Sequence, residues 1–150
     1  MSKYADVNKA VQNYIAFGNR WERVRRDFDA FCEHLDNLEG AGVKGITITR
    51  DENKQHLDIN AYGRKFGVEL LPQVTGESIR GYAIFFELLL DNSTRTIKKF
   101  VLDGGGFISD PDQTNSLPAY DASSLQLKYW INLIDLALTL EPTLDKNNNP

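Results

Sequence analysis

The sequence predicts an α+β fold: a long N-terminal helix, a five-stranded antiparallel β-meander and a C-terminal helix packed on the sheet. Apolar residues recur at helical spacing near both ends of the chain, and between them the spacing changes to alternation. Short turns separate the alternating segments, which is typical of antiparallel strands. The composition, 41% hydrophobic and 25% charged over 150 residues, predicts a single domain over residues 1–140, followed by a flexible polar tail at 141–150.

Residues 4–38 have the spacing of a long amphipathic helix. Two sets of apolar side chains each recur every seven residues: Val7, Tyr14, Trp21, Phe28 and Leu35, and Ala10, Phe17, Val24, Phe31 and Leu38. Such a helix would be about 50 Å long, more than the ~30 Å expected across a small domain. Gly18 and Asn19 could divide it, but the apolar phase continues through them, which favours one helix over two. Its aromatic residues favour packing in a core over pairing with an identical helix.

Five alternating segments follow, at residues 46–49, 56–61, 66–70, 81–90 and 96–102. Closing the first two hairpins symmetrically sets Ile48 opposite Leu57 and Ile59 opposite Val68, which gives one continuous apolar face. The same construction on the last hairpin sets Glu87 opposite Lys98. The loop at 72–78 is too long for its turn type to fix the register.

Strands four and five are expected to place four apolar side chains on the face away from the core, namely Phe85, Leu89, Phe100 and Leu102. This patch needs a cover, either the C-terminal helix or another chain. The C-terminal helix, expected from about residue 121–124 to Leu140, is apolar around most of its circumference and is expected to be buried on two sides. A homodimer is therefore expected, because one sheet and one other helix offer little cover.

A second interpretation places a ligand pocket between the aromatic helix face and the sheet, with Tyr62, His56 and Glu87 as its polar groups. Glu87 lies within a run of apolar residues, a setting that can raise the pKa of a carboxyl group and suit it to acid or base chemistry. Charge pairing of Glu87 with Lys98 and Lys65 across neighbouring strands is favoured over that role.

The segment from residue 110 to 121 has oxygen side chains at positions 1, 3, 5 and 12 of a calcium loop: Asp110, Asp112, Thr114 and Asp121. Asn115 replaces the turn glycine and two prolines interrupt the loop, so capping of the last helix by Asp121 is favoured and no metal is predicted. The glycines at 104–106 are expected to form a flexible hinge, and the loop around Phe107 could contact a partner. A single cysteine and two histidines exclude an internal disulfide and a four-ligand zinc site.

The net charge of −4 argues against nucleic acid as a partner, and no run of 18 apolar residues could cross a membrane. The first six residues lack the apolar core of a secretory signal, so a cytoplasmic location is expected. The sequence therefore favours a non-enzymatic protein-binding module without a cofactor, homodimeric and similar in plan to secretion chaperones, immunity proteins and inhibitors. A small-ligand-binding protein or enzyme is the alternative.

Overall fold

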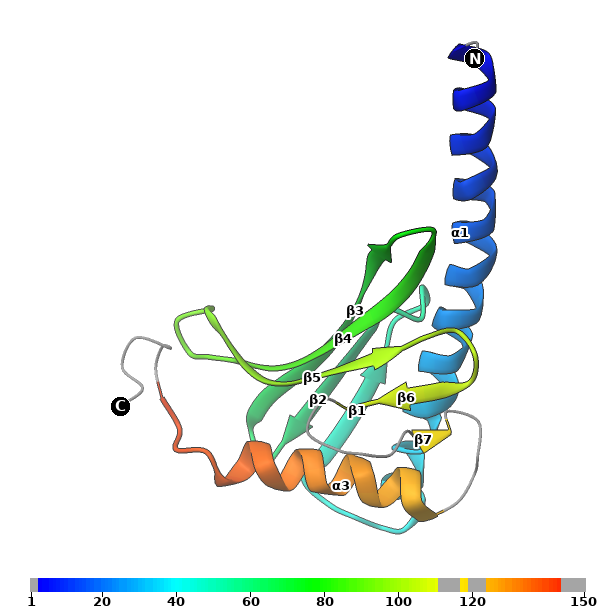
Figure 1. Cartoon of the computed structure of the whole chain (residues 1–150). Helices are drawn as coiled ribbons and strands as arrows, with labels where there is room; N and C mark the ends of the chain where they lie inside the picture. The colour runs from blue at the N-terminus through cyan, green and yellow to red at the C-terminus, as the bar shows by residue number, and fades with distance from the viewer. Residues whose placement is uncertain (1–2, 111–116, 119–123, 144–150) are drawn as a thin grey trace.

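The computed structural model describes residues 3–110, 117–118 and 124–143. These residues form three helices, α1 (Lys3–Glu33), α2 (Asp36–Gly40) and α3 (Ser124–Thr139). They also form a seven-stranded antiparallel sheet whose strand order follows the chain. The strands are β1 (Ile46–Arg50), β2 (His56–Ala61), β3 (Arg64–Thr75), β4 (Ser78–Leu88), β5 (Thr94–Leu102), β6 (Phe107–Ser109) and β7 (Leu117–Pro118). The predicted α+β fold is confirmed, with two short strands beyond the predicted five (Figure 1).

Helix α1 is continuous through Gly18, as the unbroken apolar phase predicts. It ends five residues earlier than expected, at Glu33. The amides of His34 and Leu35 bond to the carbonyls of Phe31 and Cys32, three residues back, which tightens the last turn before α2.

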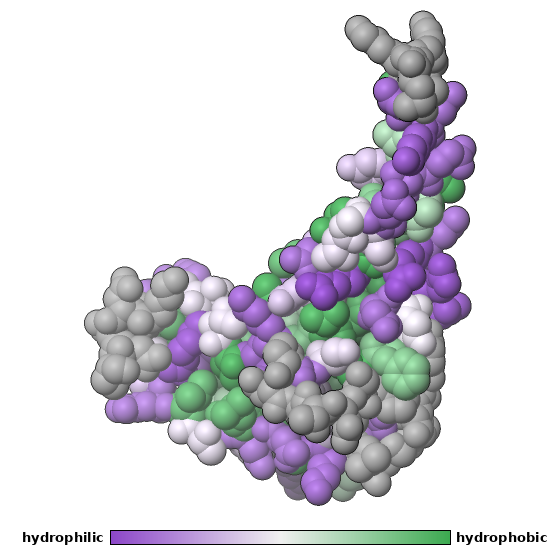
Figure 2. Space-filling model, in the orientation of Figure 1, coloured by the Kyte–Doolittle hydropathy of each residue, from purple (hydrophilic) through white to green (hydrophobic). Residues whose placement is uncertain are grey.

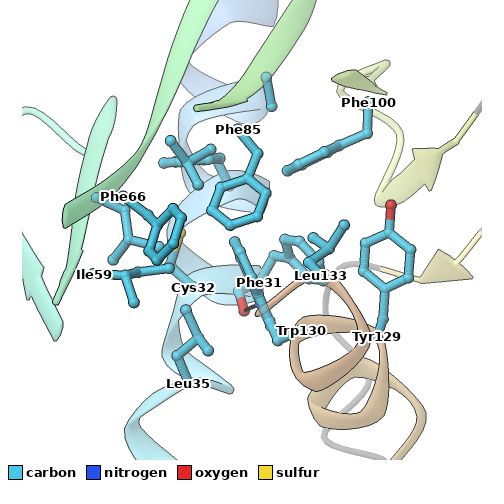
Figure 3. Close-up of a cluster of buried hydrophobic side chains, with 14 of the residues drawn as sticks. Phe31, Cys32, Leu35, Ile59, Phe66, Phe85, Phe100, Tyr129, Trp130 and Leu133 are labelled. Carbon is cyan, nitrogen blue, oxygen red and sulfur yellow. Dashed lines mark hydrogen bonds between the residues drawn. The ribbon is translucent and has the colours of Figure 1, made fainter. Parts of the chain in front are cut away.

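The C-terminal half of α1 and helix α3 pack on the same face of the sheet and enclose an aromatic core (Figure 3). Phe31 lies at its centre, stacked on Trp130 with 4.6 Å between ring centroids and edge-on to Phe100 at 5.7 Å. The indole nitrogen of Trp130 donates a hydrogen bond to the Phe31 carbonyl at 2.9 Å. Helix α3 is thus packed on the sheet, as predicted.

The first hairpins keep the predicted apolar face but are shifted by two residues. Ile48 pairs with Ile59, and Ile59 pairs with Phe66. The cause in the second hairpin is its two-residue turn at Tyr62 and Gly63, whose φ angles of 53° and 90° are typical of a type I′ turn. A shift of two residues preserves the face on which each side chain lies.

The expected apolar patch on strands four and five is wrong, because its residues lie on the core face. Strands β3 and β4 form one long hairpin that pairs Val68 with Phe85 and continues to Thr75 and Ser78. Phe85 therefore shares the face of the core residue Val68. All four predicted patch residues are buried within this one chain: Phe85, Leu89, Phe100 and Leu102.

The glycine segment after β5 is a packed turn and not the expected hinge. Gly104 and Gly106 adopt φ angles of 84° and 91°, which other residues rarely adopt, and both are buried. The amide of Gly106 donates a hydrogen bond to the Asp27 carboxylate at 2.9 Å, and Gly104 lies against Val24 of α1. The turn leads into β6, where Ile108 pairs with Leu102 in the core.

Helix α3 buries one face only, which corrects the expectation that it needs cover on two sides. Trp130, Leu133 and Ala137 are buried, whereas Ile131 and Leu136 face solvent. None of the helices in the described ranges has both the length and the apolar character needed to cross a membrane. The predicted polar tail lies outside the described residues from position 144 onward.

Candidate functional site

The N-terminal half of α1 extends beyond the sheet and away from the rest of the molecule (Figure 1). No side chain from residue 6 to residue 16 is buried, and Phe17, which follows them, is buried. Close to this point the Arg20 guanidinium donates a hydrogen bond of 3.1 Å to the carbonyl of Ile79 in β4. Residues 6–16, about three turns of α1, thus have no buried side chain in the described part of the chain.

This projecting segment carries four large apolar side chains on one side. Val7 is 57% exposed, Val11 50%, Tyr14 72% and Ile15 52%. Residues at this i, i+4, i+7, i+8 spacing share one face of a helix, because an α-helix advances about 100° per residue. We call these four residues the N-terminal stripe. Figure 2 shows apolar side chains reaching the surface of the projecting helix among polar ones.

The N-terminal stripe does not continue the core-facing side of α1. On a helical wheel its centre lies roughly 90° from the direction of Phe17, Val24 and Phe28, which face the sheet. The stripe is therefore a second apolar surface, and the sheet would not cover it even if it were longer.

The surroundings of the N-terminal stripe carry almost no charge. Between Val7 and Asn19 the sequence has one charged residue, Lys9, and helical spacing places it on the opposite side of α1. Helical spacing places the uncharged polar residues Asn8 and Gln12 along one border of the stripe and the apolar residues Ala10 and Phe17 along the other. An apolar surface with an uncharged polar border resembles the core and rim of a protein interface.

Gly18 lies at the end of the N-terminal stripe and on the same face. A Cβ atom added at Gly18 would meet nothing within 4 Å, so packing inside this chain does not require a glycine. Glycine in a helix interior costs about 1 kcal/mol relative to alanine. The stripe therefore ends in a notch, which is the space left by the missing side chain of Gly18. This glycine lowers the stability of the helix and gains no contact within the chain in return.

Sequence reasoning missed this surface, because the seven-residue repeat assigned Val7 and Tyr14 to the core. Both are exposed, so the expected core packing is wrong for this half of the helix. Two signals could have identified it. The predicted helix is longer than a small domain, and Val11 and Ile15 lie outside the two sets of the seven-residue repeat.

Of the residues predicted to contact a partner, Phe107 alone is exposed. Its side chain is 48% exposed at the start of β6, and the other four are in the core. Phe107 is a single aromatic side chain on a three-residue strand, so it forms a smaller apolar surface than the N-terminal stripe.

The three residues predicted to line a pocket do not come together. Tyr62 lies in the β2–β3 turn with its ring over Gly45, and His56 lies on the outer face of the sheet between Asp58 and Glu69. Glu87 lies on the core face of β4. The space between α1 and the sheet is filled by aromatic side chains (Figure 3), so the expected pocket is not formed there.

Glu87 is held by two arginines and not by the predicted Lys98 and Lys65. Its carboxylate accepts hydrogen bonds from Arg64 at 2.8 and 2.9 Å and from Arg95 at 2.6 Å. Burial opposes ionisation, but these two arginines outweigh it and hold the pKa of Glu87 below its ordinary value. Arg95 is opposite Glu87 because β4 and β5 pair two residues away from the predicted register up to Phe85, and a one-residue shift follows there.

The same arginines fasten the end of α3 to the sheet. Arg64 donates to the carbonyl of Leu140 at 3.0 Å, and Arg95 donates to that of Glu141 at 3.1 Å. Cationic groups at a helix C-terminus satisfy its last carbonyl groups and favour its dipole. The Glu87 cluster, defined as Glu87, Arg64 and Arg95, therefore has a structural role.

The remaining titratable groups with shifted pKa values are also engaged or buried. Burial lowers the pKa of His56, but Asp58 and Glu69 outweigh it and raise that pKa overall. Burial raises the pKa of the Asp27 carboxyl group, which accepts the Gly106 amide, and it raises the pKa of the Cys32 thiol well above its ordinary value. A buried thiol with a raised pKa is a poor nucleophile.

Asp110, the first residue of the possible calcium loop, is buried at the edge of the core. Its carboxylate accepts the hydroxyl of Tyr129 at 2.6 Å and pairs with Lys98 at 3.2 Å. Asp112, Thr114 and Asp121 lie outside the described residues. Among the residues that are described, no group of three or more His, Cys, Asp or Glu side chains is placed to hold a metal ion.

No protein-family model matches this sequence, and no curated protein or solved structure matches it.

Proposed function

We propose that this protein is a non-enzymatic protein-binding module that contacts its partner through the N-terminal stripe. The observation that carries the proposal is the exposure of Val7, Val11, Tyr14 and Ile15 on a part of α1 that no other described segment covers. Contiguous apolar surface of this kind is costly in water and marks sites of protein interaction.

The projecting helix is itself a reason to expect a partner. Isolated helices shorter than about 12–15 residues are marginal in water, because most helical stability in proteins comes from packing of an apolar face. The exposed part of α1 over residues 6–16 is no longer than this. A partner that covers Val11 and Tyr14 would supply the missing packing.

The binding role is favoured over a small-ligand site by the state of the buried polar groups. Glu87 is fully engaged with Arg64 and Arg95, and the aromatic core fills the space in which a pocket was expected. Chaperones, immunity proteins and inhibitors act by covering part of another protein, and the N-terminal stripe offers a surface suited to that kind of contact.

Photo-crosslinking in the cells that make the protein tests the proposal. Benzoylphenylalanine in place of Tyr14 keeps an aromatic ring on the stripe, and the same group in place of Lys9 presents it from the opposite side of α1. We expect a covalent protein adduct from position 14 and none from position 9. Absence of any adduct from position 14, or equal adducts from both positions, would contradict the proposed function.

A further inference from the structure

We propose that the partner of the N-terminal stripe is the same stripe of a second copy of this chain, paired antiparallel about a two-fold axis near residues 12 and 13. This inference rests on the proposed function and names the occupant of that surface. Three features of the projecting helix support it: its shape, its charge and its direction.

The shape of the N-terminal stripe fits its own antiparallel copy. Setting Val11 opposite Tyr14 of the second copy also sets Val7 opposite Gly18 of that copy. The reason is that the numbers of opposing residues in an antiparallel pair always have the same sum. The missing side chain at Gly18 then leaves space for the valine, and small residues at a helix contact allow close approach of two helices. The glycine that has no packing role inside one chain acquires one in the pair.

The charge distribution permits self-pairing. An isologous contact presents the same surface twice, so a surface with a net charge of one sign would repel its own copy. The N-terminal stripe avoids this repulsion, because Lys9 lies on the far side of α1 and the border at Asn8 and Gln12 is uncharged. A strongly charged partner would find no complementary charge beside this stripe.

The antiparallel direction follows from the fold and the side chains. Antiparallel pairing leaves the two sheets at opposite ends of the paired helices, since each sheet begins to contact α1 near Phe17 and Arg20 (Figure 1). Parallel pairing would instead bring the two sheets to the same end, and it would set Tyr14 against Tyr14 and Gly18 against Gly18. Antiparallel helix dipoles also attract one another.

The expected dimer dissociates on dilution. Four large side chains per copy provide a smaller contact than the about 800 Å² per partner of a standard interface. Sedimentation of the full chain from micromolar to millimolar concentration should therefore show a reversible monomer–dimer equilibrium.

Two matched leucine variants test whether the contact uses this surface. Gly18→Leu fills the notch without a clash inside the chain, whereas Ala16→Leu adds the same side chain to the opposite, exposed side of α1. We expect Gly18→Leu to weaken dimerisation by at least about tenfold, because overpacking separates the helices. Ala16→Leu should leave dimerisation within about twofold of the unchanged chain, and circular dichroism should show both variants folded.

Paired spin labels test the direction. Labels at Gln12→Cys and at Asn19→Cys occupy equivalent positions beside the stripe, and the native Cys32 is buried. In the antiparallel pair the two labels at position 12 lie at nearly the same height, whereas those at position 19 are offset by about 20 Å along the axis, 13 residues at ~1.5 Å each. A parallel pair would give equally short distances at both positions.

Each outcome decides between the two proposals. A chain that stays monomeric at millimolar concentration, equal dimerisation of both leucine variants, or a short distance at position 19 would overturn the antiparallel pair. If crosslinking from position 14 then captures a different protein, the proposed function stands with another occupant. If it captures nothing, the proposed function fails as well.

Discussion

The two halves of α1 are similar in apolar content and opposite in surroundings. Val24, Phe28 and Phe31 in the C-terminal half are buried against the sheet and α3, whereas Val7 and Tyr14 in the N-terminal half face solvent. The difference lies in the elements next to the helix. The sheet lies beside the C-terminal half and ends near Phe17, whereas the helix continues beyond that point toward the N-terminus. Apolar spacing therefore identifies the side of a helix that is favoured to be buried. It does not say whether the same chain or another chain buries that side.

The two helix ends of the molecule differ in the same way. The end of α3 is fastened to the sheet by Arg64 and Arg95 of the Glu87 cluster, with donors on the carbonyls of Leu140 and Glu141. The start of α1 has no comparable attachment within the described residues. The end of α3 is thus attached to the sheet, whereas the exposed N-terminal half of α1 is accessible to a contact outside the chain.

Truncating an aromatic ring in each half of α1 would test this contrast with the largest expected effect. Phe31→Ala should lower the free energy of unfolding by about 3–5 kcal/mol, because it leaves a cavity in the aromatic core. Tyr14→Ala should change it by less than about 0.5 kcal/mol in dilute monomer, because the ring is exposed. Urea unfolding at low concentration measures both. Similar losses for the two variants would mean that the N-terminal half is covered within the chain.

Removing the carboxylate of the Glu87 cluster should sharpen the contrast between the two helix ends. Glu87→Ala leaves the buried Arg95 and the half-buried Arg64 without their anion and should cost about 3 kcal/mol in the free energy of unfolding. Glu22→Ala, which removes the exposed pair with Arg25, is the matched control and should cost under about 1 kcal/mol. Amide exchange near Leu138 should accelerate in Glu87→Ala alone. Unchanged exchange there would argue against the cluster as the attachment of α3.

Acid titration should reveal the same attachment with a smaller effect. The folded pKa of Glu87 lies below its ordinary value of 4.5, so its contribution to stability is complete above pH 4.5 and is lost as the pH falls through the lowered folded pKa. Glu87→Gln should flatten this part of the stability profile, measured by urea unfolding from pH 2 to pH 6. An identical acid slope in the variant would contradict the assignment.

His56 should give the smallest effect, with the opposite sign. Its folded pKa is raised above the ordinary value of 6.5, so the stability it contributes is complete below pH 6.5 and is lost as the pH rises through the folded pKa. His56→Gln should remove this loss above pH 6.5, and dimerisation should not change because the outer face of the sheet is remote from the N-terminal stripe. A dimerisation change in this variant would point to a second contact surface.

Much of the fold follows from the sequence, because helical and alternating spacing are local properties. The continuous α1, the order of the first five strands and the position of α3 were predictable for this reason. The register was not, since the turn at Tyr62 and Gly63 and the long β3–β4 hairpin depend on backbone conformations that apolar spacing does not encode. That hairpin decides the face of Phe85, which turned an expected surface patch into core.

The candidate site was less predictable than the fold. Whether Val11 or Tyr14 is covered depends on where the sheet ends in space, a long-range property of the assembled chain. The partners of Glu87 could not be predicted either, because β4 and β5 pair two residues away from the predicted register and a further one-residue shift after Phe85 brings Arg95 opposite Glu87. The length of the predicted helix was the signal that could have located the site.

Amide hydrogen exchange along α1 tests most directly whether the N-terminal half lacks cover in its own chain and gains it from a second copy. At low micromolar concentration we expect rapid exchange over residues 6–16 and slow exchange over residues 21–31, with the change near Phe17. At millimolar concentration exchange over residues 6–16 should slow and that over 21–31 should stay the same. Equally slow exchange in both halves of the dilute protein would contradict the account.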